Sequence, residues 1–297
     1  MSHLQKRLGK PRDLLVVGDL CLDVDVFTHP HSLAGKRESR MTINEGGSAG
    51  NVAFTADRLG LKVGLATPIA DDDFGMVLEA LVRNRHENVR HYPLRGADNV
   101  TCAIVSLVNG QGSRRAYYQK NRGKCSLEGL LEIASNYSHV HLSGYTLELF
   151  NLDELLGFIT SLREVDASTS FDLFPRIGVF LESEPKVYQM LREFDFVFGN
   201  LREFKILALS NGIKGIQKFI RANQIRAIVK MGSKGSLYVD SSEVFKSPSI
   251  CVKPINLKGA GDCYVAAYLA SSLEGLSIEK SMDRANEAAG LHVSGRL

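Results

Sequence analysis

Apolar and polar positions near the start of the chain follow two patterns in succession. Residues 13–17, DLLVV, form an almost continuous apolar run, as expected of a parallel strand buried on both faces. From Leu20 to Val26 every second residue is apolar, which is typical of a strand with one exposed face. This stretch therefore predicts a strand that is buried at its start and half-exposed further on.

From about residue 126 onward, helix-like segments alternate regularly with short apolar strands. Helices are predicted over 127–135, 153–165, 185–194 and 213–223, and strands over 139–145, 168–174, 196–200 and 226–232. An earlier strand, 62–70, lies between the predicted helices 51–60 and 73–84. Alternating strands and helices predict a parallel sheet covered by helices on both faces.

Antiparallel pieces cluster in the first 122 residues. Segments 101–109 and 114–121 flank a Gly-Gln-Gly turn, which predicts a hairpin. Segment 229–239 also reads as a strand, a Gly-Ser-Lys-Gly turn and a return strand. With no repeat or linker in the sequence, we expect one α/β domain over 1–297 with a small β excursion.

The composition is ordinary for a globular protein and excludes several classes. The 297 residues are 44% hydrophobic, and the net charge of +3 gives no indication of a nucleic-acid partner. The sequence has no signal-like start and no apolar run long enough to cross a bilayer. We therefore expect a cytoplasmic protein with no membrane partner.

Cysteine and histidine spacing argues against disulfides and zinc. The five cysteines are odd in number, widely spaced and without a CxxC pair, so neither a disulfide nor a zinc site is expected. His86 and His91 are five residues apart, which would place them on different faces of a helix. Their segment, HENVRH, is predicted to be a solvated loop.

The segment Gly259-Ala260-Gly261-Asp262 stands where an apolar strand gives way to a helix. Small residues at a helix N-terminus let an anion approach free backbone N–H groups. A carboxylate there makes sense if it takes a proton from a hydroxyl that attacks a phosphate. The alternative from this segment alone is a simple helix cap at Asp262.

Two other segments place polar residues or glycines at the start of helices. Segment 45–53, EGGSAGNVA, puts glycines ahead of a helix with Asn51 near its start. Asn200 ends a predicted strand, and Glu203 falls in the first turn of the following helix. Taken alone, the latter pair is a capping box; at the edge of a parallel sheet it can also bind a ligand. No Walker A or GxGxxG pattern occurs.

In this order, the motifs resemble those of the ribokinase-like carbohydrate kinases, the PfkB family. GGSAGNVAFTADRLG and NLKGAGDCYVAAYLA resemble the two family signatures, GNLRE its Asn-x-x-Glu motif and KMGSKG its nucleotide loop. The resemblance covers nearly the whole chain. It implies a three-layer ribokinase-like fold, with a mostly parallel central sheet, helices on both faces and a small β-sheet lid formed roughly by 20–44 and 101–122.

The resemblance also implies roles for individual residues. Asp262 is implied to be the catalytic base, with Gly259, Ala260 and Gly261 as the anion hole. Glu203 is implied to act on Mg²⁺ through water. The implied nucleotide-binding residues are Asn200, Lys230, Gly232, Ser233, Gly235, Gly261 and Asn286, and the implied substrate-binding residues are Asp23, Gly47 and Asn51. ATP and Mg²⁺ are the expected cofactors.

One departure from the family pattern concerns a monovalent cation. Asn256-Leu257-Lys258 replaces the usual Asp-Thr-x ahead of the anion hole, so a potassium site is doubtful. Lys258 either supplies the missing positive charge itself or points to solvent.

The predicted activity is transfer of the γ-phosphate of ATP to a hydroxyl of a small sugar or sugar derivative. A nucleoside kinase, a sugar-phosphate kinase and a non-enzymatic sugar-sensing protein remain alternatives. A phosphate on the substrate could be held by basic residues of the lid, or these could simply be solvated: Arg37, Arg40, Arg114, Arg115, Lys120 and Arg122. We also expect a homodimer formed through the lid.

Overall fold

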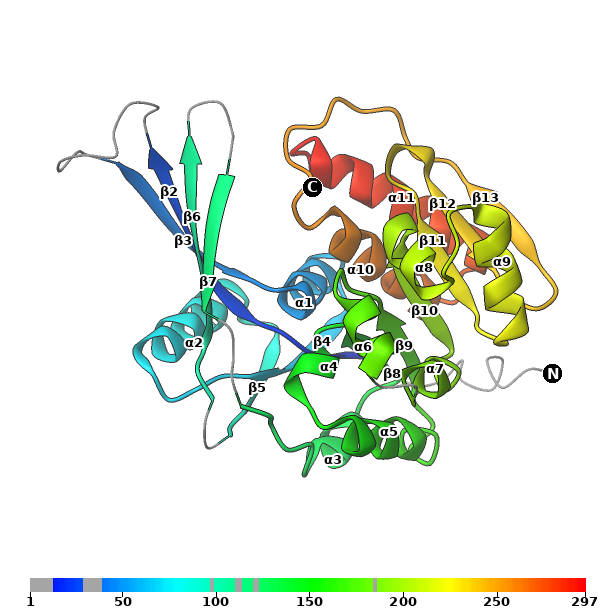
Figure 1. The fold of residues 1–297 in the computed structure, drawn as a ribbon. Coiled ribbons are helices and arrows are strands. Elements are labelled where there is room, and N and C mark those ends of the chain that lie inside the picture. Colours follow the sequence, from blue (N-terminus) through cyan, green and yellow to red (C-terminus); the bar gives the residue numbers. More distant parts are fainter. Residues whose placement is uncertain (1–12, 29–38, 97–98, 110–113, 120–122, 184–185) are drawn as a thin grey trace.

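The computed structural model describes residues 13–28, 39–96, 99–109, 114–119, 123–183 and 186–297. Within these residues the chain forms a large sheet of nine strands and a small sheet of four (Figure 1). The large sheet has the order β13-β12-β11-β10-β9-β8-β1-β4-β5. Its strands are β1 (Asp13–Val17), β4 (Lys62–Pro68), β5 (Arg90–Leu94), β8 (His139–Ser143), β9 (Ser168–Asp172), β10 (Phe196–Asn200), β11 (Ala227–Lys230), β12 (Ser236–Val239) and β13 (Val244–Ser247).

Neighbouring strands of the large sheet run parallel from β5 to β11, and the pairs β11–β12 and β12–β13 are antiparallel. The mostly parallel sheet expected from the sequence is therefore confirmed. The antiparallel pair β11 and β12 is the predicted hairpin around the Gly-Ser-Lys-Gly turn, which forms the short 3₁₀ turn η2 (Gly232–Lys234).

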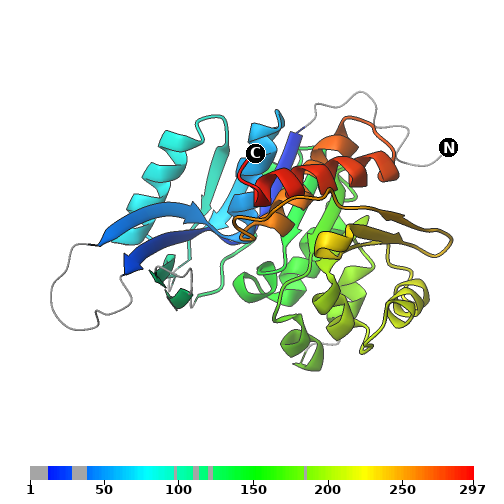
Figure 2. The ribbon, with the colours of Figure 1, turned by 90° about the horizontal axis from the view of Figure 1, so that it is seen from above.

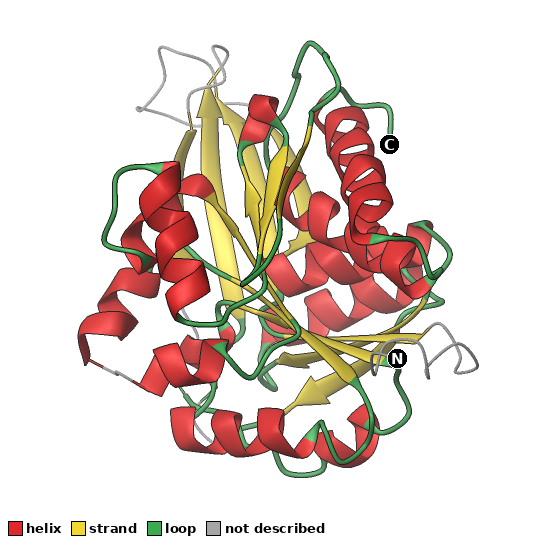
Figure 3. Cartoon of the chain, turned by 90° about the vertical axis from the view of Figure 1, so that its right-hand side faces the viewer, coloured by secondary structure: helices red, strands yellow, loops and turns green. Residues whose placement is uncertain are grey.

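Helices cover both faces of the large sheet, as Figure 3 shows. The alternation along β1 fixes the two faces, because Leu15 and Val17 belong to one buried cluster and Leu14 and Val16 to the other. The second cluster includes residues of α1 (Ser48–Arg58), α2 (Asp73–Arg85), α10 (Ala260–Leu273) and α11 (Ile278–Val293). The first includes residues of α3 (Leu130–Ala134), α4 (Thr146–Leu149), α5 (Leu152–Ser161), α6 (Ile177–Ser183), α7 (Lys186–Leu191), α8 (Leu201–Leu207) and α9 (Ile213–Ala222).

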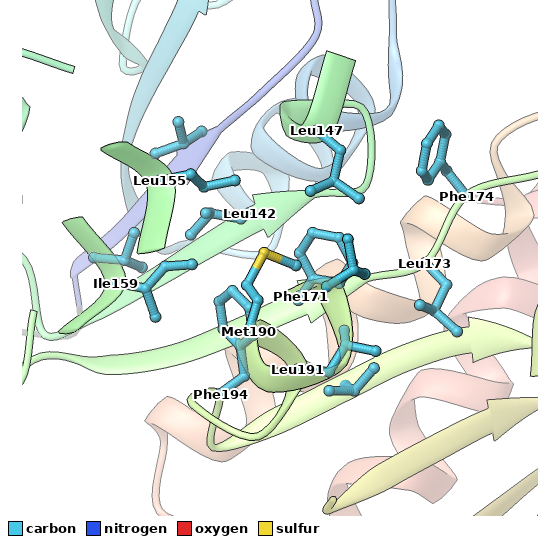
Figure 4. Packing of buried hydrophobic residues seen from close by; sticks show 14 of the residues in the cluster. Leu142, Leu147, Leu155, Ile159, Phe171, Leu173, Phe174, Met190, Leu191 and Phe194 are labelled. Atoms are coloured by element: carbon cyan, nitrogen blue, oxygen red, sulfur yellow. The ribbon is translucent and has the colours of Figure 1, made fainter. Parts of the chain in front are cut away.

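Large apolar side chains fill the space between the sheet and the helices. Phe171 of β9 is fully buried and stacks on Phe194, with ring centroids 5.3 Å apart. Met190 and Leu191 of α7 pack in the same cluster (Figure 4). This rigid layer fixes the carboxyl ends of the central strands, where the polar residues discussed below are located.

The small sheet has the order β3-β2-β6-β7 and stands away from the large sheet (Figure 2). Its strands are β2 (Cys21–Thr28), β3 (Arg40–Gly46), β6 (Cys102–Asn109) and β7 (Arg114–Gln119). The hairpin of β6 and β7 is confirmed, and all four strands come from the two segments expected to form a lid, with β3 reaching two residues further. Of the basic residues named for this region, Arg37, Lys120 and Arg122 lie outside the described residues.

One expectation was wrong and another held only in part. Cys21 and Cys102 are joined by a disulfide, because the parallel register of β2 and β6 places them directly opposite each other, with Cα atoms 4.7 Å apart. Their separation of 81 residues hides this pairing in the sequence.

HENVRH is a loop over residues 86–89, where Glu87 and Asn88 are exposed as expected. Its two histidines are not solvated loop residues: His86 stacks on Phe54 at 3.7 Å between centroids, and His91 lies in β5.

Among the described residues, no helix has both the length and the apolar character needed to span a membrane.

Candidate active site

Three polar side chains lie at the carboxyl ends of three adjacent parallel strands. Asp172 ends β9, Asn200 ends β10 and Lys230 ends β11. The register pairs Asn200 directly with Lys230, and Asp172 with the residue two before Asn200. Ligands of open α/β sheets bind at this edge, so the fold itself gathers these side chains where a site is expected.

Lys230 and Asp172 form a buried ion pair that spans β10. The Lys230 Nζ lies 2.8 and 2.6 Å from the two Asp172 oxygens. Burial lowers the pKa of Lys230, but the neighbouring carboxylates Asp172 and Glu203 raise it, and the net shift is upward. Lys230 is therefore a permanent positive charge at this edge. Asp172 was not among the residues singled out from the sequence.

Asn200 and Glu203 close the first turn of α8 on itself. Asn200 Oδ1 accepts from the backbone N–H groups of Arg202 and Glu203, and Glu203 Oε2 accepts from the backbone N–H of Asn200, so the capping box predicted from the sequence is present. Burial, then the nearby Asp172, raises the pKa of Glu203 to about 7. This edge thus carries more carboxylate than its single lysine neutralises.

The Gly259–Asp262 turn begins α10. Gly259 has φ 76°, a left-handed conformation that favours glycine, and no side chain caps the helix. The first N–H groups of α10 are therefore available at a terminus with partial positive charge. A Cβ placed on Gly261 would lie 3.4 Å from Lys230 Nζ, so this ammonium stands beside the turn.

Asp262 is a half-buried carboxylate held by two residues of α1. Ser48 Oγ donates to Asp262 Oδ1 and Asn51 Nδ2 to Asp262 Oδ2, both at 2.8 Å. Burial raises the pKa of Asp262 to about 7, although Asn51, Lys230 and Ser48 each oppose the rise. A carboxylate with a pKa near neutrality is suited to accept a proton at physiological pH. Asn51 was singled out from the sequence, whereas Ser48 was not.

The start of α1 depends on a second carboxylate that the sequence analysis missed. Gly47 precedes this helix with φ 94°, and a Cβ there would lie 2.6 Å from the Asp19 carbonyl oxygen. Asp19 accepts from the backbone N–H of Ser48 at 2.7 Å and from Ser143 Oγ at 2.8 Å. Asp19 thus supplies the cap that Gly47 cannot, and it positions Ser48 for its bond to Asp262.

Lys258 is in contact with the small sheet. Its Nζ forms an ion pair with Asp23 Oδ2 of β2, so this side chain does not simply point to solvent. Asp23 belongs to the small sheet and Lys258 immediately precedes the Gly259–Asp262 turn. The pair therefore connects the small sheet to the main body.

The remaining residues assigned to the nucleotide lie further along the same edge. Gly232 and Ser233 are exposed in η2. Gly235 has φ 80°, and a Cβ there would clash with the Ser247 carbonyl oxygen, so this glycine permits a close backbone approach. Asn286 is buried and donates to Ser236 and Ser247, which makes it a structural amide in this state. Their roles toward a nucleotide remain predictions.

Two recesses lie away from this edge of the sheet. One of about 580 Å³ is lined by residues at the amino ends of β9 to β11, among them Thr169, Asp195 and Arg226. The other, of about 550 Å³, includes Asp13 and Lys62 at the amino ends of β1 and β4. Neither is favoured as the site, because the carboxyl edge holds the glycine turn and the carboxylates with raised pKa, and ligands of such sheets bind at that edge.

A carboxylate of neutral pKa beside an anion-attracting helix terminus suits an enzyme that transfers phosphate to a hydroxyl. The family described as pfkB family carbohydrate kinase matches residues 11–296, so the chain belongs to this family and is a carbohydrate kinase.

The chain is 26% identical over 320 residues to 5-dehydro-2-deoxygluconokinase of Listeria monocytogenes serotype 4b, covering 98% of this chain and 93% of that protein. Adenosine kinase of Sinorhizobium meliloti has a similar structure, with TM-score 0.77, 20% identity and coverage of 95% and 93%. Ribokinase of Arabidopsis thaliana, complexed with ribose and ATP, has TM-score 0.74, 20% identity and coverage of 96% and 93%. These similarities confirm the ribokinase-like fold.

Proposed function

We propose that this kinase transfers the γ-phosphate of ATP to a hydroxyl of a small sugar derivative, with Asp262 as the base. The observation that carries the proposal is the raised pKa of Asp262, about 7, in a carboxylate fixed by Ser48 and Asn51. As the substrate oxygen attacks phosphorus, its proton passes to Asp262. The new O–P bond forms as the bond between the γ-phosphorus and the bridging oxygen breaks, and ADP leaves.

The transferring phosphate would lie against the Gly259–Asp262 turn. Its negative oxygens would meet the N–H groups at the start of α10, and Lys230 beside Gly261 adds a positive charge. These groups are already in place before substrate binds, because Asp172 holds the Lys230 ammonium through both of its carboxylate oxygens. Catalysis by such an arrangement rests on positioning and electrostatics.

The residues present fit Mg²⁺ that is held mainly by phosphates and water. No group of three or more histidine, cysteine or acidic residues in the described part of the chain could cage a metal ion. Mg²⁺ usually keeps several waters and takes only one or two carboxylates from the protein. The buried Glu203, whose pKa is raised by burial and Asp172, would orient that hydration shell. When bound, the ion would neutralise charge on the phosphates.

The direct test measures ADP formation with purified protein, Mg-ATP and single acceptors. The panel should contain pentoses, hexoses, sugar acids, sugar phosphates and nucleosides, since the related proteins include kinases named for a gluconate derivative, ribose and adenosine. Acceptor-dependent ADP formation is expected, and Asp262→Asn should lower its rate by about a hundred- to ten-thousand-fold. If no acceptor stimulates turnover, and a sugar binds without reacting, the sensing protein becomes the better interpretation.

Potassium is expected to be unnecessary. Asn256 Oδ1 accepts from the backbone N–H of Lys258 at 3.0 Å, and the Lys258 carbonyl lies 2.7 Å from His292 Nε2. These two oxygens, which lie just ahead of the Gly259–Asp262 turn, are therefore already hydrogen-bonded within the protein. Turnover in sodium- and potassium-free buffer with an organic counter-ion should match turnover with added potassium, and a several-fold activation by potassium would contradict this.

A homodimer through the small sheet is supported by an apolar row on one of its faces. Ile43, Val24, Val105 and Tyr117 are paired across the four strands, on the face opposite Asp23. Ile43 is 45% exposed and Tyr117 is 55% exposed in the single chain. Such a row is normally covered by another surface.

Light scattering at micromolar concentration tests this assembly. The parent is expected to be dimeric and Tyr117→Lys monomeric, whereas Tyr118→Lys, on the other face of β7, should stay dimeric. A monomeric parent would overturn the proposal.

We also expect the enzyme to be cytoplasmic, which cell fractionation would test.

A further inference from the structure

The ion pair between Asp23 and Lys258 is exposed on one side only. The Asp23 side chain is 4% exposed, whereas the Lys258 side chain is 44% exposed. Gly46 packs so closely on the carboxylate that a Cβ at this position would lie 2.5 Å from Asp23 Oδ2. A molecule that approaches this pair therefore meets the ammonium, with the carboxylate behind it.

Asp23 holds the Lys258 ammonium in position. Its Oδ2 contacts the Lys258 Nζ, and its Oδ1 has no hydrogen-bond partner among the described residues. The expected role of Asp23 toward sugar hydroxyls stays a prediction, and the ammonium beside it is a second polar group at the same place.

The backbone of Lys258 is also fixed. Its N–H is held by Asn256 and its carbonyl by His292 of α11, so both ends of the residue are constrained just ahead of the Gly259–Asp262 turn. An ammonium has three donors, and Asp23 uses one, which leaves two for another partner. A positive group fixed in this way loses little conformational entropy when it binds an anion.

We propose, on the basis of the phosphotransferase function above, that Lys258 is a specificity residue that binds an anionic oxygen group on the acceptor. That group is the carboxylate of a sugar acid or the phosphate of a sugar phosphate. It would sit on Lys258, while the hydroxyl to be phosphorylated faces Asp262 four residues later. Neutral sugars of the same size lack the partner for this ammonium and bind more weakly.

The experiment compares Lys258→Met and Lys258→Arg with the parent on three acceptor classes: aldonic acids, sugar phosphates and neutral aldoses of matched length. For the anionic class used by the parent, Lys258→Met should raise KM about tenfold to a hundredfold, the range of a lost charge-assisted hydrogen bond. Lys258→Arg should recover part of the loss. KM for ATP and for neutral aldoses should hardly change.

Two controls separate binding from folding. Lys253→Met removes an exposed lysine of the same segment and should leave all three classes unchanged. Lys258→Met combined with Asp23→Asn avoids an unpaired buried charge, and it should retain the parent's melting temperature while still losing the preference for anionic acceptors. Isothermal titration with a non-phosphorylatable sugar acid gives the same comparison without turnover.

The outcomes distinguish the two proposals. If the parent turns over neutral aldoses as well as or better than both anionic classes, and Lys258→Met leaves that ranking unchanged, the role of Lys258 is wrong while the kinase remains. If no acceptor of any class is phosphorylated, the proposed function itself has failed. A higher kcat/KM for sugar acids than for sugar phosphates, or the reverse, identifies which anionic group Lys258 binds.

Discussion

The Lys230 side chain, at the end of β11, extends across β10, and its Nζ donates hydrogen bonds to both carboxylate oxygens of Asp172, at the end of β9. The Lys230 side chain is only 13% exposed and that of Asp172 only 6%. Removing one partner of a buried pair leaves the other charge without compensation. The pair therefore stabilises this edge of the sheet and also holds the positive charge that stands beside Gly261.

Lys230→Met should lower the free energy of unfolding by about 3–5 kcal/mol, the usual cost of orphaning a buried charge. Chemical denaturation at pH 7 measures the change. The matched control is Lys234→Met, which removes an exposed lysine from the neighbouring turn and should cost less than about 0.5 kcal/mol. Equal stability of the two variants would show that Asp172 finds another partner.

Asp262→Asn should retain ATP binding and lose about a hundred- to ten-thousand-fold in kcat, the usual range for a general base. Because the pKa of Asp262 is raised to about 7, parent kcat/KM should rise with pH through neutrality as the carboxylate ionises. Stopped assays between pH 5.5 and 9 with a saturating nucleotide measure both effects. Near-normal turnover in the variant would remove Asp262 from the mechanism.

Ser48→Ala tests which carboxylate gives that pH dependence. The Ser48 hydrogen bond lowers the pKa of Asp262, so its loss should move the rising limb of kcat/KM to higher pH. Glu203 also has a pKa of about 7, and Glu203→Gln serves as the comparison. Glu203→Gln should reduce turnover but leave the rise of kcat/KM at the same pH. If the rise of kcat/KM with pH is lost in Glu203→Gln and unchanged in Ser48→Ala, the group that titrates is Glu203 and not Asp262.

Gly259→Ala should both destabilise the protein by about 1–2 kcal/mol and slow turnover. Its φ of 76° favours glycine. An alanine there would either adopt this unfavourable left-handed conformation or change the backbone and so move the N–H groups of the turn. The matched control is Gly157→Ala within α5, where a Cβ would meet nothing within 4 Å and alanine favours the helix. Thermal melts should therefore change in opposite directions for the two variants.

A buried histidine makes stability depend on pH. Burial, together with the charges of His139 and Lys230, holds the pKa of His141 well below 6.5, and the side chain is fully buried. Below pH 6.5 the unfolded chain binds a proton at His141, whereas the folded chain does not. The contribution of His141 to the free energy of unfolding is therefore fully present above pH 6.5 and is lost as pH falls. The melting temperature should drop less between pH 7.5 and 5 in His141→Leu than in the parent. Parallel curves would rule out this contribution.

The architecture of the large sheet could be predicted because its signal is local. The strands β8, β9 and β10 are each followed by helical segments, and this alternation itself implies parallel pairing. The capping box of Asn200 and Glu203 is equally local, since its two residues are three apart. Such features depend on neighbours in the sequence, and the structure reproduces them.

Contacts between distant strands could not be predicted in the same way. Asp172 falls near the end of a predicted strand, as Asn200 does, and that position was a usable signal. Its pairing with Lys230 depends on strand order, which the local pattern does not give. The Cys21–Cys102 bond and the Asp19–Ser143 contact likewise depend on register between segments more than 80 residues apart. The tertiary arrangement, and no local preference, determines these contacts.

The paired cysteines at the base of the small sheet also set its mechanics. Cys21 and Cys102 join β2 to β6 at their first residues, and the two strands stay paired beyond Phe27, so they would move as one unit. At about 3.3 Å per residue, Asp23 lies about 7 Å from the line through the two cysteines and Phe27 about 20 Å. A rotation about that line would carry the far end of β2 about three times as far as Asp23, so the contact of Asp23 with Lys258 would be displaced much less than the far end.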